Sequence, residues 1–257
     1  MTLLVSKTGI EIEIPGVRRV DRNAPKRWLA KGWDDIKANT GFSIGIGIVF
    51  VAIGYFATYI AWQAPWALMT AITGFLLMAP VLAIGFYAIS CAHEQNRVPT
   101  LGQAIRCWRG NGRSIMLYAL LLFLVLFIWS RFNWLMTALM MHASGSVFTL
   151  TPERLLASAE GWGFIASYAL VGLLIAAAVF AGSVVTLQLM MDRKTDPVTA
   201  VVTSIQTVIQ NKKVMAHWAG LIFALTTVGI ATAYLGLIVL FPLLGHASWH
   251  AYRDMVE

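Results

Sequence analysis

Residues 214–252 have the sequence VMAHWAGLIFALTTVGIATAYLGLIVLFPLLGHASWHAY, which contains no Asp, Glu, Lys or Arg. As one helix this stretch would be roughly 58 Å long at 1.5 Å per residue, about twice the hydrocarbon thickness of a bilayer. We therefore expect two membrane-spanning helices here, with a turn between Gly229 and Gly236. Across the 257 residues, 58% are hydrophobic and only 12% are charged, against roughly 25% charged in an average soluble protein. This composition excludes a soluble globular domain.

Four further apolar blocks precede this stretch, and each is long enough to cross a bilayer. They cover residues 41–62, the segment from the Pro65 break to about Ser90, residues 115–134 and residues 162–191. The sequence thus predicts an all-α, polytopic membrane bundle of six spans, with five spans as the alternative. We expect one membrane domain over residues 25–257, after an N-terminal segment (1–24) in which residues 2–14 favour two short strands around Ser6 to Gly9.

The basic residues predict the orientation of the bundle. With six spans and the N-terminus inside, 17 of the 19 Lys and Arg residues lie on the cytoplasmic side, and only Arg131 and Arg154 lie outside. Five spans would move only Arg253 across. The net charge of +7 is therefore an orientation signal and an attraction to anionic lipid, so it does not indicate nucleic-acid binding. The first 39 residues contain no secretory signal, and we expect a multi-pass protein of the bacterial inner membrane with both termini cytoplasmic.

Three short amphipathic helices are predicted on the cytoplasmic side, each beginning near a proline. They follow Pro25, Pro99 and Pro197, and the last is expected to be capped by Asp196. We interpret them as interfacial helices, each preceding a pair of spans. Together they suggest three units, at about residues 25–90, 99–191 and 197–257, around a pseudo-threefold axis. Such a bundle suits a pore and a packed scaffold equally.

Four histidines are candidates for a metal or haem site. His246 and His250 are four residues apart and so share one helix face. In the six-span arrangement His217 and His93 lie at a similar depth on the cytoplasmic side. If they converge, these imidazoles could bind copper, zinc or haem iron. The alternative is that they are interfacial histidines, in a region where five residues anchor the protein at the headgroups: Trp249, Tyr252, Arg253, Trp28 and Trp33.

Other patterns for chemistry are weak or missing. Met136, Met140, Met141 and His142 form a thioether and imidazole patch that would suit Cu(I), although methionine also fills apolar helices. The chain has no Walker lysine motif, no GxSxG sequence and no Rossmann glycine pattern. We therefore predict no catalytic residues, and no cofactor is required by the sequence.

Several local blocks together resemble a bacterial integral-membrane family catalogued as domain of unknown function 2189. The blocks are Trp-Leu-Ala-Lys-Gly-Trp-Asp-Asp at 28–35, Ile89-Ser90 with Glu94, Asp192-Arg193, residues 200–204, and Phe-Pro-Leu-Leu-Gly-His-Ala-Ser-Trp-His-Ala-Tyr-Arg-Asp at 241–254. Cys91-Ala92-His93 stand where members more often carry basic residues. The resemblance implies a helical inner-membrane protein, and the family brings no established activity.

Three functions remain open from the sequence. The first is a non-catalytic accessory, assembly or scaffold component of a larger membrane complex, with lipids and other membrane subunits as partners. The second is a channel or transporter for a small solute or lipid. The third is a haem- or metal-dependent respiratory assembly factor that uses the four histidines. The first fits the missing catalytic motifs best.

Overall fold

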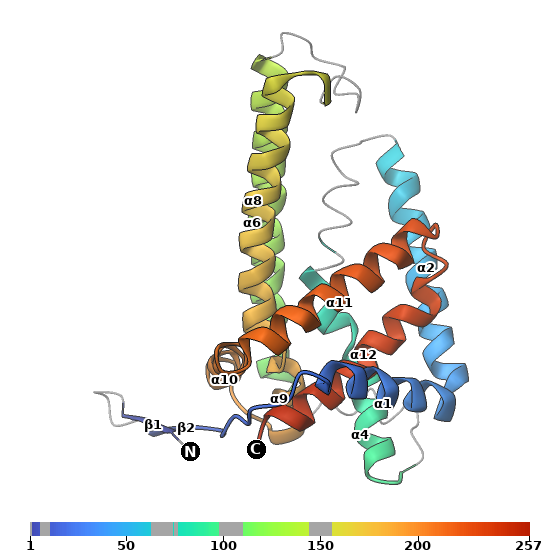
Figure 1. Cartoon of the computed structure of the whole chain (residues 1–257), viewed down its shortest axis with the longest axis vertical. Helices are drawn as coiled ribbons and strands as arrows, with labels where there is room; N and C mark the ends of the chain where they lie inside the picture. The colour runs from blue at the N-terminus through green and yellow to red at the C-terminus, as the bar shows by residue number, and fades with distance from the viewer. Residues whose placement is uncertain (1, 6–10, 63–73, 75–76, 98–109, 144–155) are drawn as a thin grey trace. The chain divides into compact units, whose positions relative to one another are not determined.

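The computed structural model describes residues 2–5, 11–62, 74, 77–97, 110–143 and 156–257 (Figure 1). Two strands, β1 (Thr2–Val5) and β2 (Glu11–Ile14), pair antiparallel at the two segments for which the sequence favours strands. The other regular elements in these ranges are helices. They are α1 (Ala24–Ala38), α2 (Thr40–Trp62), α4 (Ile84–Glu94), α6 (Gly112–Ala143), α8 (Ala159–Ser183), α9 (Thr186–Arg193), α10 (Pro197–Gln210), α11 (Lys212–Ala231) and α12 (Leu237–Met255).

The chain folds into two compact units, and the long helices α2, α6 and α8 contribute to both. Unit 1 comprises Met1–Phe56, Ala79–Ala119 and Phe180–Glu257, and it contains α1, α4 and α9 to α12. Unit 2 comprises Ala57–Met78 and Leu120–Val179. These boundaries do not follow the three predicted repeats. The candidate site described below lies entirely within unit 1.

Five helices of the described chain are long and apolar enough to cross a membrane. They cover Thr40–Tyr59, Leu77–Glu94, Gly112–Leu139, Gly161–Arg193 and Lys212–Ala231. Large apolar side chains on these helices are exposed, among them Phe56 on α2, Ile128 on α6, Leu173 on α8 and Phe223 on α11. Such a surface is unfavourable in water and normal in lipid. The chain is therefore an integral membrane protein with several membrane-length helices.

Helix α12, the sixth span predicted from the sequence, is not among these five. Its first half is apolar, but its second half carries His246, His250, Arg253 and Asp254. Most of that second half is buried against protein, because α12 packs on α1 and α4. The predicted turn is present, since α11 ends at Ala231 and α12 begins at Leu237.

Glycines allow α12 to approach its neighbours closely. A Cβ atom at Gly32 of α1 would lie 2.9 Å from the Ala247 backbone nitrogen, and one at Gly245 would lie 2.6 Å from the Phe86 ring. Contacts of this length do not occur between real Cβ atoms and backbone. The backbones of α1 and α12 can therefore approach closely only because residue 32 has no side chain.

The segment before α1 contacts the last residues of the chain. Val17 forms an antiparallel bridge with Val256, the Arg18 N–H donates to the Met255 carbonyl at 2.8 Å, and the Glu257 N–H donates to the Gly16 carbonyl at 2.9 Å. Backbone hydrogen bonds of this kind hold two segments directly side by side. Residues 16–18 and 255–257 therefore lie on the same face of unit 1.

Helices α1 and α10 lie where the sequence predicts short helices near Pro25 and Pro197. Helix α10 starts at Pro197, and the Asp196 carboxylate accepts the backbone N–H groups of Val198 and Thr199. This is the N-cap expected from the sequence. Helix α1 starts at Ala24, one residue before Pro25. The helix predicted after Pro99 falls largely on residues 98–109, outside the described residues.

Candidate functional site

A carboxylate lies on the buried face of α1. Trp28, Gly32, Asp35 and Ile36 are all buried, and they follow the i, i+4, i+7, i+8 spacing of one helix face. The Asp35 side chain is only 3% exposed. Burying a carboxylate costs several kcal/mol unless it is paired and hydrogen-bonded, so this residue must find donors inside the protein.

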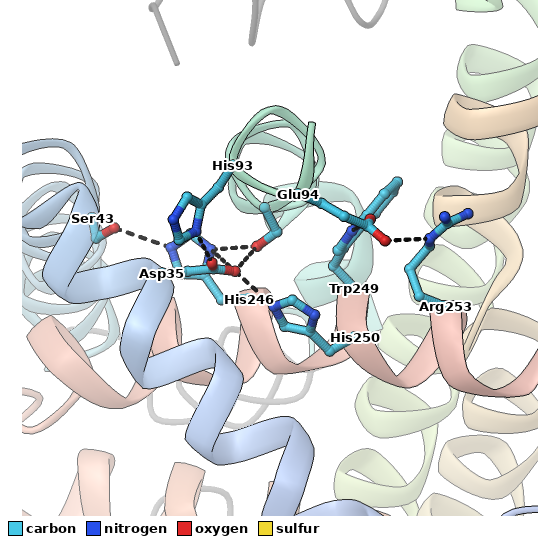
Figure 2. A network of polar contacts seen from close by, with 9 residues as sticks. Asp35, Ser43, His93, Glu94, His246, Trp249, His250 and Arg253 are labelled. Carbon is cyan, nitrogen blue, oxygen red and sulfur yellow. Dashed lines mark hydrogen bonds and ion pairs between the residues drawn. The ribbon is translucent and has the colours of Figure 1, made fainter. Parts of the chain in front are cut away.

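Three donors from α4 and α12 contact Asp35 (Figure 2). His93 Nδ1 lies 2.5 Å from Asp35 Oδ1. The Ser90 hydroxyl donates to Asp35 Oδ2 at 2.5 Å, and His250 Nε2 lies 2.8 Å from the same oxygen. An ionised carboxylate can only accept hydrogen bonds, so both imidazoles donate through these nitrogens. The carboxylate thus joins α1, α4 and α12.

A third imidazole, that of His246, extends the cluster to α2. His246 Nδ1 lies 2.8 Å from Ser90 Oγ, and His246 Nε2 lies 3.0 Å from Ser43 Oγ. Because the Ser90 proton is given to Asp35, Ser90 Oγ must accept from the His246 Nδ1–H. A neutral His246 then accepts the Ser43 proton at Nε2. The hydrogen bonds therefore run in one direction, from Ser43 through His246 and Ser90 to Asp35.

The surroundings of Asp35 favour its charged form. Burial by itself raises the pKa of this carboxyl, but hydrogen bonds from His250, Ser90 and His93 outweigh that effect and lower the pKa to about 2. Asp35 is therefore ionised at neutral pH. Its charge is the centre on which the neighbouring donors converge.

The order Ser43, His246, Ser90, Asp35 has the hydrogen-bonding pattern of an activated nucleophile with its base and orienting group. A nucleophile must also reach a substrate. Ser43 and His246 both have 0% exposed surface, and so has Ser90. In this structure the Ser43 hydroxyl cannot meet a substrate, so the arrangement favours holding helices or relaying a proton over nucleophilic catalysis.

A second set of polar contacts fixes the C-terminal part of α12. Trp249 Nε1–H donates to Glu94 Oε2 at 3.2 Å, and Arg253 Nε donates to Glu94 Oε1 at 3.0 Å. The Tyr252 hydroxyl donates to Asp192 Oδ2 at 2.6 Å. Arg253 also contacts Asp192, at 3.3 Å. Glu94, at the end of α4, and Asp192, in α9, thus accept hydrogen bonds from side chains in the C-terminal part of α12.

Three of the four aromatic residues predicted as interfacial anchors are buried in contacts with protein groups. Trp28, Trp249 and Tyr252 are each at most 1% exposed. Trp28 donates to Asp254 at 2.8 Å, just as Trp249 and Tyr252 donate to other carboxylates. Only Trp33 of the four predicted aromatic anchors is exposed, at 46%. A buried indole and a headgroup-facing indole both need one hydrogen-bond acceptor, so the sequence pattern alone does not separate them.

The structure brings three of the four predicted metal-binding histidines together. His93, His246 and His250 all belong to the cluster, whereas His217 is exposed on α11. A metal would need several nitrogens to face one empty point at about 2.0 to 2.1 Å. Here the nitrogens face the Asp35 carboxylate or a serine hydroxyl instead. Within the described residues, no group of three or more His, Cys, Asp or Glu could hold a metal ion.

The methionine patch predicted for Cu(I) lies at the end of α6. Met136 is within this helix, in unit 2. The side chains of Met140, Met141 and His142 lie outside the described part of the chain. The copper hypothesis for these residues therefore stays a prediction.

Sequence analysis missed Asp35, Ser43 and Ser90. The helical periodicity of α1 indicates Asp35 as a buried residue, because it lies seven residues after Trp28 on the same helix face. The two serines gave no comparable signal, since an isolated serine in an apolar helix is common.

These features define the class of protein, a helical integral membrane protein with a buried polar cluster in one unit. Residues 68–192 match the model of a family described as "Predicted integral membrane protein (DUF2189)", which confirms the resemblance over these residues. Ser90, His93 and Glu94 lie within the matched segment, whereas Asp35, His246 and His250 lie outside it. The comparisons with curated proteins and with solved structures gave no match.

The first prediction concerns the central carboxylate. Asp35→Asn places an amide NH₂ or a neutral oxygen where three donors now meet a negative charge. We expect the free energy of unfolding to fall by about 3 kcal/mol, the usual cost of breaking a buried charge network. Thermal unfolding of the detergent-solubilised protein measures the change.

The matched control is Asp34→Asn, one residue earlier. Asp34 is exposed and pairs with Lys37 at the surface. Its replacement should change stability by less than about 0.5 kcal/mol. Equal effects of the two variants would contradict a central role for Asp35.

The second prediction concerns pH. The pKa of Asp35 is lowered in the folded state to about 2, so its stabilising effect is complete above its ordinary pKa of 3.8 and is lost as the pH falls towards 2. Other carboxylates titrate in the same range, so the difference between wild type and Asp35→Asn is the quantity to measure. We expect this difference to shrink by about 2 kcal/mol between pH 5 and pH 2. A difference that stays constant would contradict the lowered pKa.

Proposed function

We propose that this chain is a non-catalytic component of the bacterial inner membrane, acting as an accessory, assembly or scaffold subunit of a larger membrane complex. The observation that carries the proposal is that the polar cluster is buried and connects four helices. Ser43, Ser90 and His246 are fully buried, and the cluster joins α1, α2, α4 and α12. A satisfied network of this kind rigidifies a core and specifies one packing of its helices.

Six membrane crossings with both ends of unit 1 in the cytoplasm form part of this proposal. Residues 16–18 are hydrogen-bonded to residues 255–257, so both must lie on one side of a membrane. The number of crossings between them must then be even. The five candidate spans alone give an odd number, so we propose that α12 forms the sixth crossing. The excess of Lys and Arg assigns that side to the cytoplasm.

The proposed threefold repeat has support from two asparagines. Asn111 and Asn211 each directly precede a membrane-length helix. Asn111 Nδ2 donates to the Thr195 carbonyl at 2.8 Å, and Asn211 Nδ2 donates to the Arg18 carbonyl at 3.0 Å. In each case the amide contacts the backbone ahead of another short cytoplasmic helix. Equivalent roles at equivalent positions are what a repeat predicts.

A second candidate function, proton movement by a transporter or channel, has one observation in its favour. The hydrogen-bonded chain begins at His93, whose side chain is 44% exposed, and passes through Asp35, Ser90 and His246 to Ser43 at 0% exposure. Ser43 lies in the first turn of α2, a candidate span. Because each donor points towards Asp35, a chain of this kind passes a proton from Ser43 towards Asp35. The haem or metal alternative has no comparable support.

The third prediction tests the topology. Reporters that are active on only one side of the inner membrane are fused before Met1 and after Glu257. Both fusions should give the cytoplasmic signal, because the two ends share one face of unit 1. A cytoplasmic signal at one end and a periplasmic signal at the other would contradict six crossings.

The fourth prediction separates the two candidate functions. After gentle solubilisation of native membranes, the tagged chain should retain a stoichiometric membrane protein partner that mass spectrometry identifies. The purified chain in liposomes should pass protons no faster than protein-free liposomes do.

A partner-free protein would overturn the scaffold proposal. Proton flux that disappears in Ser43→Ala, which removes the inner end of the chain, would favour the second function. Thr227→Ala is the matched control, since the Thr227 hydroxyl is on α11 and bonds within its own helix.

A further inference from the structure

Helix α10 turns its polar side towards the protein and its apolar side outward. Its buried residues are Thr199, Ala200, Thr203, Ser204 and Thr207. Among the exposed large hydrophobic residues of the chain, three belong to α10: Val198, Ile205 and Ile209, at 64%, 39% and 56%. In a water-soluble protein a surface helix has the opposite arrangement.

The buried hydroxyls explain how the polar side can face inward. The Ser204 hydroxyl donates to the Ala181 carbonyl at 2.7 Å, and the Thr186 hydroxyl lies 3.3 Å from the Ala200 carbonyl. Thr203 and Thr207 donate to carbonyls one turn earlier in their own helix, both at 2.8 Å. Every buried hydroxyl named here has an acceptor. The hydroxyl groups on the inward side of α10 therefore have their hydrogen-bond acceptors inside the protein. The outward side is apolar and needs an apolar environment.

The position of α10 in the chain identifies that environment. The preceding candidate span ends at Arg193 and the following one begins at Lys212, so α10 is tied at both ends to membrane-length helices. In Figure 1, α10 is seen almost along its axis while α11 runs across the view, so the chain turns sharply at Asn211. A helix that connects two spans and runs in a different direction from the span after it lies at the membrane boundary.

Exposed cations flank both ends of this apolar face. Arg193 and Lys194 precede α10, and Lys212 and Lys213 follow it. Asn211 also binds the Val20 N–H and the Arg18 carbonyl, which brings the exposed Arg19 to the same end.

Two acidic groups lie near these five cations. The Asp196 carboxylate caps α10, and Asp192 accepts the Tyr252 hydroxyl and lies 3.9 Å from Arg193. The surface around the apolar face therefore carries a net positive charge.

We propose that α10 is an interfacial helix that binds anionic phospholipid. Val198, Ile205 and Ile209 enter the acyl-chain region, and the cations at the two ends of the helix contact the headgroup phosphates. An apolar stripe between two basic ends matches the boundary between acyl chains and anionic headgroups. The surface is thus assigned to lipid. A protein partner or a second copy of the chain would give a different result in the following test.

The test of immersion uses spin labels on the full-length protein in nanodiscs of phosphatidylcholine and phosphatidylglycerol. In a background of Cys91→Ala and Cys107→Ala, single labels are attached in Ile209→Cys and in Gln210→Cys, which is the exposed polar neighbour. The label at 209 should be more accessible to oxygen than to a water-soluble nickel complex, and the label at 210 should show the reverse. Water-like accessibility at 209 would overturn the proposal. So would a label at 209 that neither reagent reaches, because a protein would then cover the face.

The test of lipid recognition counts phosphatidylglycerol molecules retained by the delipidated protein in native mass spectrometry. Lys212→Gln with Lys213→Gln should lower phosphatidylglycerol retention at least about fivefold, since each cation near the surface contributes about 1 kcal/mol. Lys26→Gln with Lys31→Gln removes the same charge from exposed positions of α1 and should leave retention nearly unchanged. Equal losses in the two double variants, or no loss in the first, would overturn the assignment to α10.

Discussion

The buried charge of Asp35 is the constraint on which the packing of unit 1 depends. A carboxylate that is 3% exposed can persist only while His93, Ser90 and His250 face it, and these residues come from α4 and α12. The positions of three helices are therefore coupled through one side chain. Helix α2 is coupled to them as well, because His246 is hydrogen-bonded to both Ser90 and Ser43. The arrangement also depends on the close approach of α1 and α12 at Gly32. A bulkier residue there would hold the α12 donors away from the Asp35 carboxylate.

Helix α12 combines two environments in one element. Its first half is apolar, whereas its second half directs His246, His250, Trp249 and Tyr252 into protein partners. The carboxylates that accept hydrogen bonds from this half come from α1, α4 and α9. A count of charged residues treats such a segment as a span, because histidine, tryptophan and tyrosine carry no formal charge in the count. The buried hydrogen bonds, rather than lipid, provide the environment for these side chains.

The sequence was sufficient for the positions of most helices and for part of the site. The uncharged run at residues 214–252 predicted the α11–α12 turn, and the four-residue spacing of His246 and His250 placed both on one face. Asp35 was missed, although its spacing from Trp28 placed it on the buried face of α1. Ser43 and Ser90 could not be predicted, since their roles depend on contacts between helices far apart in the chain. His217 is exposed on α11 and does not join the other three histidines, because depth in a membrane does not specify the direction that a side chain faces on its helix.

The bridge between Val17 and Val256 has a consequence for biogenesis. The segment ahead of α1 is synthesised long before residues 255–257, so the pair closes only after these later residues have left the ribosome. Until then the Asp35 carboxylate lacks His246 and His250. Insertion of the earlier spans can proceed during synthesis. The Asp35 site is therefore complete only after α12 has been synthesised, and a chain without α12 leaves this carboxylate without its His250 partner.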